Sequence, residues 1–331
     1  MTRMVVVGNG MVGARFVEDL LAADRTGRYR VTVVGDDECE PYNRVLLCEV
    51  VAGLHDLGSL TLPTPKDPRL VLRRGDPAVA LDREDRAVVT ASGARHRYDQ
   101  VVLATGSTAR IPPLGGLGDN PGRLPRGVHP LRTIDDARDI VAATLNARHA
   151  VVLGAGVLGL EAACGLARRG IAVTVVHPAA ALMERQLDEH ASRVVEQAMR
   201  GLGIDHRVGV GAQDALLHHG ALRGVLLADG ETIDADLLVL TTGTIASTRL
   251  ATGAGLRADR GVLVGPGLAT LDDARVFAIG DCAQPPEGGT GLVAQGWEQS
   301  RRLAAVLTSA ENGPAGSVLT SRAPASRVSS D

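Results

Sequence analysis

Aromatic side chains are scarce in this sequence, which has one tryptophan, three tyrosines and two phenylalanines in 331 residues. A hydrophobic core must therefore be built from valine, leucine, alanine and isoleucine. Hydrophobic residues still make up 45% of the chain and glycine is abundant at 40 residues, a composition that suits an α/β protein with many tight turns. The length is enough for two domains.

Charge of one sign and long apolar runs are also lacking. The net charge is -3 and the pI about 6.3, so neither a basic face for nucleic acid nor a block of like charge is present. The longest apolar run, residues 150–167, is interrupted by four glycines and by Glu161, which argues against a membrane span. No secretory signal pattern is visible at the start. We therefore expect a cytoplasmic protein that binds neither nucleic acid nor membrane.

Cysteine is the third scarce residue. Cys39, Cys48, Cys164 and Cys282 show neither a C-x-x-C pair nor the spacing of metal ligands. The nine histidines show no metal spacing either. We expect no metal site, a reducing environment, and packing roles for Cys164 and Cys282.

Glycine, in contrast, is arranged in a motif close to the start. A strand-like run, residues 4–8, leads into G-x-G-x-x-G at Gly8, Gly10 and Gly13, and residues 11–24 can be helical. In a βαβ dinucleotide fold the first glycine permits the tight turn, the second lets the backbone approach a pyrophosphate, and the third lets helix and strand pack closely. The pyrophosphate then lies at the helix N-terminus. One such motif is weak evidence, because Gly-rich turns are common.

An acid follows the next predicted strand. Residues 30–35 form a buried β-branched run, and Asp36 comes directly after it. A carboxylate at the end of the second strand can accept hydrogen bonds from both ribose hydroxyls. The alternative is a solvated turn acid, and the preceding motif favours ribose binding.

The whole pattern then restarts. Strand-like residues 150–153 precede a second G-x-G-x-x-G at Gly154, Gly156 and Gly159, followed by a helix predicted over 160–169 and a strand over 171–176. Two such units in one chain are far more specific than one and predict two dinucleotides.

Each half also contains a buried strand that ends in Thr-Gly. These ends are Thr105-Gly106 and Thr242-Gly243, at the edge of an open sheet where ligands bind. Short strands between residues 70 and 90 predict a small antiparallel insertion. Pro and Gly at 111–130 predict a linker before a helix over 131–148.

These residues together resemble the two-dinucleotide-binding-domain flavoprotein family of pyridine nucleotide–disulfide oxidoreductases. The likeness is carried by both glycine motifs, both Thr-Gly ends and the late apolar strand ending in Gly280-Asp281. Within the family it is strongest to the flavin module of the assimilatory NAD(P)H nitrite reductase large subunit, through residues 6–13, 41–47, 173–177, 182–188 and 291–294. It spans about residues 4–308.

The resemblance implies an α/β fold with two Rossmann-like domains. Residues 1–112 and 250–308 would form a discontinuous FAD-binding domain, and 113–249 an NAD(P)H-binding domain. Residues 309–331, rich in Ser, Ala, Pro, Gly and Arg, are expected to be a disordered tail.

The resemblance also implies roles for single residues. The FAD side would consist of Gly8, Asn9, Gly10, Met11, Gly13, Asp36, Arg44, Val79, Thr105, Gly106 and Asp281, with Asp36 on the adenosine ribose, Val79 near the adenine and Asp281 on the ribityl chain. The NAD(P)H side would consist of Gly154, Gly156, Val157, Gly159, Glu161, His177 and Gly243. Glu161 would lie near the nicotinamide and the flavin, although it can also be a simple helix carboxylate.

Several features depart from the family pattern. Cys39 and Cys48 lie nine residues apart rather than in a C-x-x-x-x-C pair, Glu49 replaces a lysine, and the Arg-Pro-Asn run after the second Thr-Gly is missing. The family's third, interface domain and a siroheme or iron–sulfur module have no counterpart in the sequence, so we do not expect this chain alone to reduce nitrite.

The sequence thus predicts an FAD-dependent NAD(P)H oxidoreductase that passes electrons to a separate redox protein of nitrite or nitrate assimilation. Hydride transfer between stacked rings needs positioning rather than an acid or base, so no catalytic side chain is expected. A helix from about Leu292 would direct its N-terminus at the flavin, and Trp297 on it would either pack or contact the ring. End-of-strand signals do not separate NADH from NADPH, and the resemblance favours NADH weakly.

Two alternatives remain at this stage. One is a non-catalytic FAD- or nucleotide-binding module, and the other is a thiol-dependent reductase that uses Cys48. The oligomeric state and the identity of the acceptor are left open.

Overall fold

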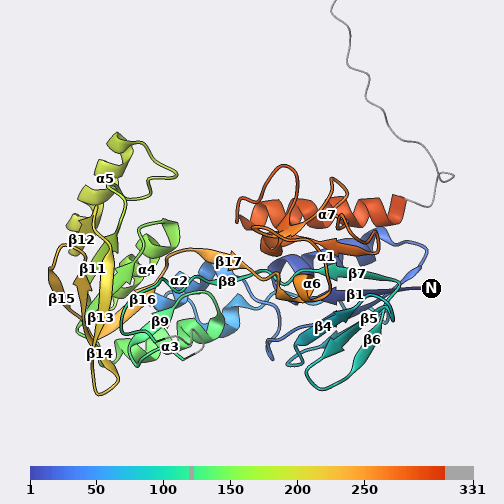
Figure 1. The fold of residues 1–331 in the computed structure, drawn as a ribbon, viewed down its shortest axis with the longest axis horizontal. Helices are drawn as coiled ribbons and strands as arrows, with labels where there is room; N and C mark the ends of the chain where they lie inside the picture. Colours follow the sequence, from blue (N-terminus) through green and yellow to red (C-terminus); the bar gives the residue numbers. More distant parts are fainter. Residues whose placement is uncertain (119–122, 310–331) are drawn as a thin grey trace, which may run out of the picture.

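The computed structural model describes residues 1–118 and 123–309 and has two lobes that lie side by side (Figure 1). Each lobe is built on a five-stranded parallel sheet. This confirms the predicted α/β fold with two Rossmann-like units. The predicted disordered tail, apart from Ser309, lies outside the described residues.

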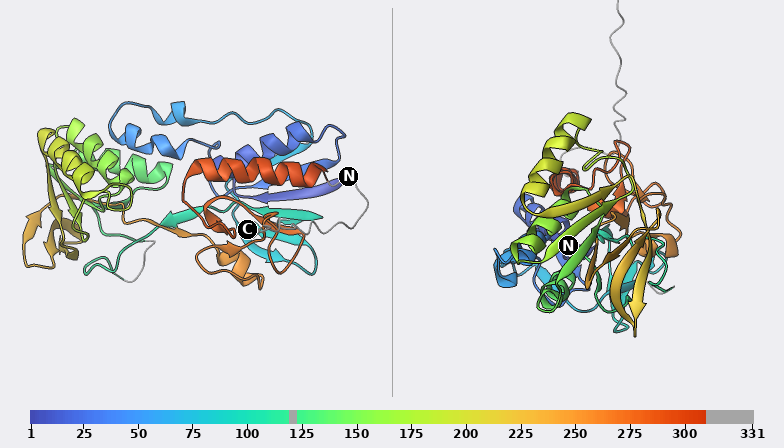
Figure 2. Two further views of the ribbon diagram at one scale, coloured as in Figure 1. Left: turned by 90° about the horizontal axis from the view of Figure 1, so that it is seen from above. Right: turned by 90° about the vertical axis from the view of Figure 1, so that its left-hand side faces the viewer.

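The first lobe contains the N-terminal glycine motif. In sheet order its strands are β19 (Val276–Ala278), β7 (Gln100–Leu103), β1 (Thr2–Val7), β2 (Tyr29–Val34) and β3 (Leu70–Arg73). The sheet contains segments from both ends of the chain, because β19 pairs with β7. Helices α1 (Met11–Ala23) and α7 (Val293–Ser309) pack together over it, as Figure 2 shows from above. Phe16 and Leu20 of α1 are fully buried against the strands.

The second lobe repeats this arrangement around the second motif. Its strands in sheet order are β12 (Ile204–Val208), β11 (Ala172–His177), β10 (His149–Leu153), β16 (Leu237–Leu240) and β9 (Val128–Pro130). Its helices are α3 (Ile134–Thr144), α4 (Val157–Arg168) and α5 (Glu189–Gly201). Nearly every side chain of β10 and β16 is buried, as expected for parallel strands covered on both faces.

Smaller sheets complete the lobes. The antiparallel insertion predicted over residues 70–90 is confirmed for β4 (Ala78–Asp82) and β5 (Ala87–Thr90), which form a sheet with β6 (Arg95–Arg97). Its first strand was wrong, because β3 pairs parallel with β2 in the main sheet. The second lobe has a similar sheet of β13 (Ala212–His218), β14 (Ala221–Leu227) and β15 (Thr232–Asp234). The remaining short elements are α6 (Arg249–Gly253), η3 (Gly280–Cys282), and β18 (Val262–Leu263) paired with β20 (Ala283–Gln284).

Two connections join the lobes. A ribbon of β8 (Ser107–Ala109) and β17 (Thr244–Ala246) continues from the two Thr-Gly ends and pairs antiparallel between the lobes (Figure 1). A segment with η1 (Arg44–Leu46), α2 (Leu47–Val51) and η2 (Leu57–Leu60) leaves the first lobe after β2 and buries its apolar residues in the core of the second. The first lobe therefore supplies part of the second lobe's core.

Two predicted helix limits were wrong. The helix expected over 131–148 spans only Ile134–Thr144, because Thr133 caps it in a capping box with Asp136. The helix expected from 160 begins at Val157, directly after Gly156. In the described ranges no helix is long and apolar enough to cross a membrane, and no three metal-ligating side chains gather there.

Candidate functional site

A cavity of about 460 Å³ opens at the carboxyl ends of β1, β2 and β7, where the first lobe faces α4 of the second. Its volume is in the range of small-molecule and cofactor sites. Of the residues predicted for FAD, it is lined by Gly8, Asn9, Gly10, Met11, Asp36, Arg44, Thr105, Gly106 and Asp281. Val157 and Glu161, predicted for the second dinucleotide, line it as well. The structure thus brings most of the first group and two residues of the second to one cavity, whereas Gly13, Gly154, Gly156 and Gly159 do not line it.

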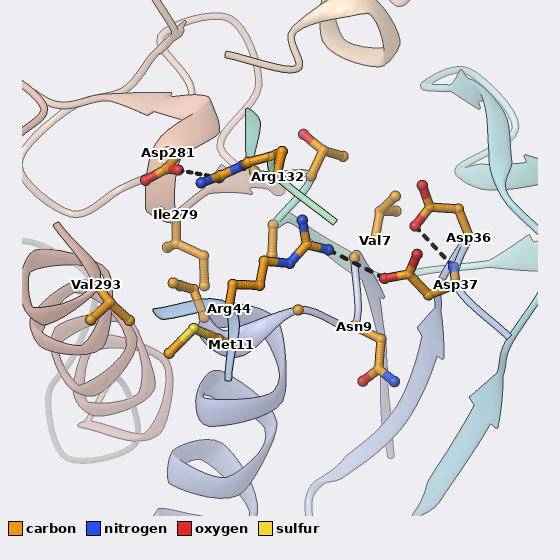
Figure 3. A pocket seen from close by; sticks show the side chains of 18 of the residues that line it. Val7, Asn9, Met11, Asp36, Asp37, Arg44, Arg132, Ile279, Asp281 and Val293 are labelled. Atoms are coloured by element: carbon orange, nitrogen blue, oxygen red, sulfur yellow. Dashed lines mark hydrogen bonds and ion pairs between the residues drawn. The ribbon is translucent and has the colours of Figure 1, made fainter. Parts of the chain in front are cut away.

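One side of the cavity is acidic. Asp36 and Asp37 follow β2, and Figure 3 shows them on the same side as Asn9. Arg44 of η1 reaches across to Asp37, with 3.2 Å between its nitrogen and the carboxylate, and lies 5.1 Å from the ring centre of Tyr42. Burial raises the pKa of Asp37, and the Arg44 charge opposes that rise. Asp36 has no ion pair with a described residue, and its Oδ1 accepts from the Asp37 amide at 3.1 Å (Figure 3). The other oxygen, Oδ2, is left to accept from a ligand hydroxyl.

The other side contains a partly buried polar cluster. Asp281 of η3 accepts hydrogen bonds through one oxygen from the Arg132 guanidinium and the Ser107 hydroxyl, at 2.7 and 2.8 Å. Arg132 precedes α3 in the second lobe, so this cluster also links the lobes (Figure 3). Ile279 and Val293 add apolar surface beside it.

The first glycine turn has room for a ligand at one position only. A Cβ on Gly8 would lie 2.2 Å from the carbonyl oxygen of Ala104, and one on Gly13 would lie 2.1 Å from that of Gly8. Gly8 also has a φ of 112°, which disfavours other residues. A Cβ on Gly10 would meet nothing within 4 Å. Packing within the protein therefore explains Gly8 and Gly13, while Gly10 faces open space at the start of α1.

The second glycine turn has the same geometry. Gly154 has a φ of 110°, and a Cβ on it would lie 2.6 Å from the Thr241 carbonyl oxygen. A Cβ on Gly159 would lie 2.0 Å from the Gly154 oxygen, whereas one on Gly156 would meet nothing. Both turns thus leave the middle glycine open at a helix N-terminus, which is the geometry that a pyrophosphate requires.

Glu161 lies on α4 where the two lobes meet. The residue is exposed and lines the cavity. The surrounding protein still removes some water from its carboxylate, and this desolvation raises the pKa of Glu161. A hydrogen bond with the Cys48 thiol opposes the rise in this pKa, and the negative charge of Glu49 adds to it. A carboxylate here is available to a ligand that spans both lobes.

The other predicted residues lie outside the cavity lining. Val79 is 59% exposed on β4, next to Pro77 and Ala78, which do line the cavity. His177 ends β11 and lies by the second glycine turn, where its Nδ1 accepts from the Ala155 amide at 3.4 Å. Gly243, with a φ of 102°, begins the turn into the ribbon, and its carbonyl accepts from the Arg110 amide.

The chain matches the family model described as pyridine nucleotide-disulphide oxidoreductase over residues 2–306. The chain belongs to this family. Among its relatives, nitrite reductase [NAD(P)H] of Bacillus subtilis (strain 168) is 33% identical over 98% of this chain and 40% of its own length. The assimilatory nitrate reductase electron transfer subunit of the same organism is 32% identical over 91% of the chain and 38% of its own length.

A similar solved structure is that of the ferredoxin reductase for the CYP199A2 system from Rhodopseudomonas palustris. It superposes with a TM-score of 0.86 at 30% identity, over 93% of this chain and 76% of its own. The chain thus spans about two fifths of the two Bacillus relatives and about three quarters of this reductase.

Among the described residues, the structure shows no disulfide between the cysteines of this family member. All four are free. Cys48 is 4% exposed, and burial raises the pKa of its thiol to about 12, with the Glu161 carboxylate adding to the shift. A thiol with this pKa is protonated at neutral pH and is a poor nucleophile. The geometry therefore offers no support for a reductase that works through Cys48.

The sequence pattern missed Arg132, Asp37 and Ser107. Arg132 directly precedes Thr133, the N-cap of α3, and only the fold brings it to Asp281. Asp37 could have been found, because it directly follows Asp36 at the end of the same strand.

Proposed function

We propose that this chain is an FAD-dependent NAD(P)H oxidoreductase that passes electrons through the flavin to a separate redox protein, as a component of nitrite or nitrate assimilation. In this proposal residues 1–112 and 250–308 form the FAD-binding domain and 113–249 the NAD(P)H-binding domain. The observation that carries it is the single cavity that extends from the first glycine turn to Val157 and Glu161 at the second.

The residues of the cavity fit FAD. The open space at Gly10 and the amides at the start of α1 suit a pyrophosphate. Asp36 offers an acceptor for ribose hydroxyls, and the second oxygen of Asp281 is left for a polyol chain. When bound, FAD would accept a hydride from the nicotinamide and release single electrons to an acceptor.

The chain's own groups would bind and orient the two dinucleotides. Helix α7 begins at Val293 beside the cavity, so its first amides would favour negative charge that develops there. Gly156 at the start of α4 would admit the nicotinamide dinucleotide's pyrophosphate. NADH is the favoured nucleotide in this proposal, since no cluster of basic residues follows β11.

The names of two similar proteins support a separate redox protein as the electron acceptor. One is an electron transfer subunit of assimilatory nitrate reductase and another is a ferredoxin reductase. Both names describe proteins that hand electrons to a partner rather than complete a reduction alone. We extend that role to this chain.

Anaerobic titration of the purified protein with NADH tests the proposal. We expect the flavin absorbance to bleach and ferricyanide to be reduced in turn. Gly156→Val is the matched control, because open space at Gly156 lets the fold accept the side chain while nucleotide approach is blocked. This variant should keep FAD and bleach with dithionite but not with NADH.

Two results would contradict the proposal. A protein that takes up no FAD would overturn it altogether. A protein that holds FAD but is reduced by neither NADH nor NADPH would be a non-catalytic binding module instead.

A further inference from the structure

The second lobe has no acid where the first lobe has Asp36. The parallel register pairs Val7 with Val34 in the first lobe and Leu153 with Val176 in the second. Asp36 lies two residues after Val34, so the equivalent residue two after Val176 is Pro178. The position that contacts the adenosine ribose in this type of fold is therefore empty of charge in the second lobe.

A residue further along the chain supplies a carboxylate near this position of the second lobe. The segment between β11 and α5 (Figure 1) carries Glu184, whose Oε2 lies 2.9 Å from His177 Nε2. The Met183 amide donates to the carbonyl of Ala155, the residue between the first two glycines of the turn, at 3.0 Å. Glu184 is thus held next to the glycine turn.

His177 fixes how this carboxylate is oriented. Its Nδ1 accepts a hydrogen bond from the Ala155 amide. In the neutral ring Nε2 therefore carries the proton, and its N–H donates a hydrogen bond to Glu184. Burial alone would raise the pKa of Glu184, but the hydrogen bond from His177 and a backbone amide hold that pKa below its ordinary value. The group is therefore an anion at neutral pH.

Arg185 also pairs with this anion, at a longer distance than His177. Its Nε lies 3.8 Å from the other Glu184 oxygen, and the side chain is 85% exposed. An extended side chain of this kind contributes little to a fixed anion site. The group with a fixed position beside the second glycine turn is therefore the Glu184 carboxylate. A carboxylate accepts hydrogen bonds from hydroxyl groups and repels a phosphate group.

We propose that Glu184, positioned by His177, contacts the adenosine ribose of the nicotinamide dinucleotide and makes the chain selective for NADH over NADPH. The inference rests on the proposed function, because the second lobe must hold that nucleotide. The ribose diol donates to the carboxylate in NADH, whereas the 2′-phosphate of NADPH brings like charge against it.

Calorimetric binding of NAD⁺ and NADP⁺ to the FAD-loaded protein tests this without turnover. The key variant is Glu184→Gln, which removes the charge but keeps an oxygen that accepts from His177. We expect wild type to bind NAD⁺ more tightly. The variant should narrow the ratio of the two dissociation constants about tenfold, chiefly by gaining NADP⁺ affinity. Arg185→Gln is the matched control, and its ratio should stay within about twofold of wild type.

Each other outcome overturns the inference. If the ratio of the two dissociation constants is unchanged in Glu184→Gln, the carboxylate does not determine the selectivity. If wild type binds NADP⁺ more tightly than NAD⁺, the selectivity is the opposite of the one proposed. A change confined to Arg185→Gln would assign selectivity to the arginine. If wild type binds neither nucleotide, the proposed function fails together with the inference, which separates that failure from the other three.

Discussion

Gly10 is the residue of the first glycine turn that packing within the protein does not explain. Its φ of -81° and ψ of -172° suit any residue, and it caps α1 with no neighbour near a Cβ. Serine is a good N-cap, so Gly10→Ser should leave the stability of the apoprotein nearly unchanged. FAD affinity should fall roughly tenfold or more, because about 1.4 kcal/mol of lost contact is a factor of ten. Fluorescence titration of apoprotein with FAD measures this.

Gly13→Ser is the matched comparison. Its Cβ would meet the Gly8 carbonyl oxygen at 2.1 Å, and this overpacking should destabilise even the apoprotein by about 1–3 kcal/mol or more. Equal effects of the two substitutions on urea unfolding would contradict the separate roles of the two glycines.

At the scale of residues, the sequence predicted what depends on local spacing. Gly8, Gly10 and Asp36 could be located in advance, because a strand, a tight turn and a helix follow one another directly along the chain. Arg132 could not, because its meeting with Asp281 depends on how two distant segments fold together.

Helix α7 packs against η3 and holds the turn at Gly280 in place. Gln299 is 3% exposed, and its side-chain oxygen accepts from the Gly280 amide at 2.7 Å. Gln299→Leu removes the side-chain acceptor of this partly buried amide, which should cost about 1–3 kcal/mol. FAD affinity should fall as well, since Gly280 lines the cavity. Denaturant unfolding with and without FAD measures both effects.

Glu298→Leu is the control on the same helix. Glu298 is exposed, so its replacement should change neither stability nor FAD affinity by much. If Gln299→Leu behaves like this control, the amide has another acceptor and α7 does not hold the turn.

At the scale of elements, type was easier to predict than partner. The capping box at Thr133 and the glycines before α1 and α4 are local signals. The apolar residues of α2, by contrast, predict a buried helix without stating in which core it is buried. The segment follows β2 of the first lobe but packs into the second, because the chain turns away from its own sheet before α2.

The molecule as a whole is two similar units whose contact surface includes the cavity. Ligand stabilisation should therefore reach both units, although most of the lining comes from the first. Three structures cross between them: the β8–β17 ribbon, the segment containing α2, and the hydrogen bonds of Arg132. Two of these also contribute side chains to the cavity lining: Arg44 and Val45 on the segment containing α2, and Arg132 itself.

Arg132 should therefore couple FAD binding to the stability of the second unit. FAD at about 100 times its dissociation constant should add about 2.7 kcal/mol to wild-type stability, and calorimetry should show the whole transition shifting upward. Arg132→Ala removes the donors to Asp281 and Ser107, so FAD should bind more weakly. The unfolding transition of the second unit should then separate from that of the first and should no longer move to higher temperature when FAD is added. Arg138→Ala, which removes an exposed ion pair on α3, the helix that follows Arg132, should shift as wild type does. A single transition in Arg132→Ala that rises fully with saturating FAD would assign the coupling to the ribbon and the α2 segment instead.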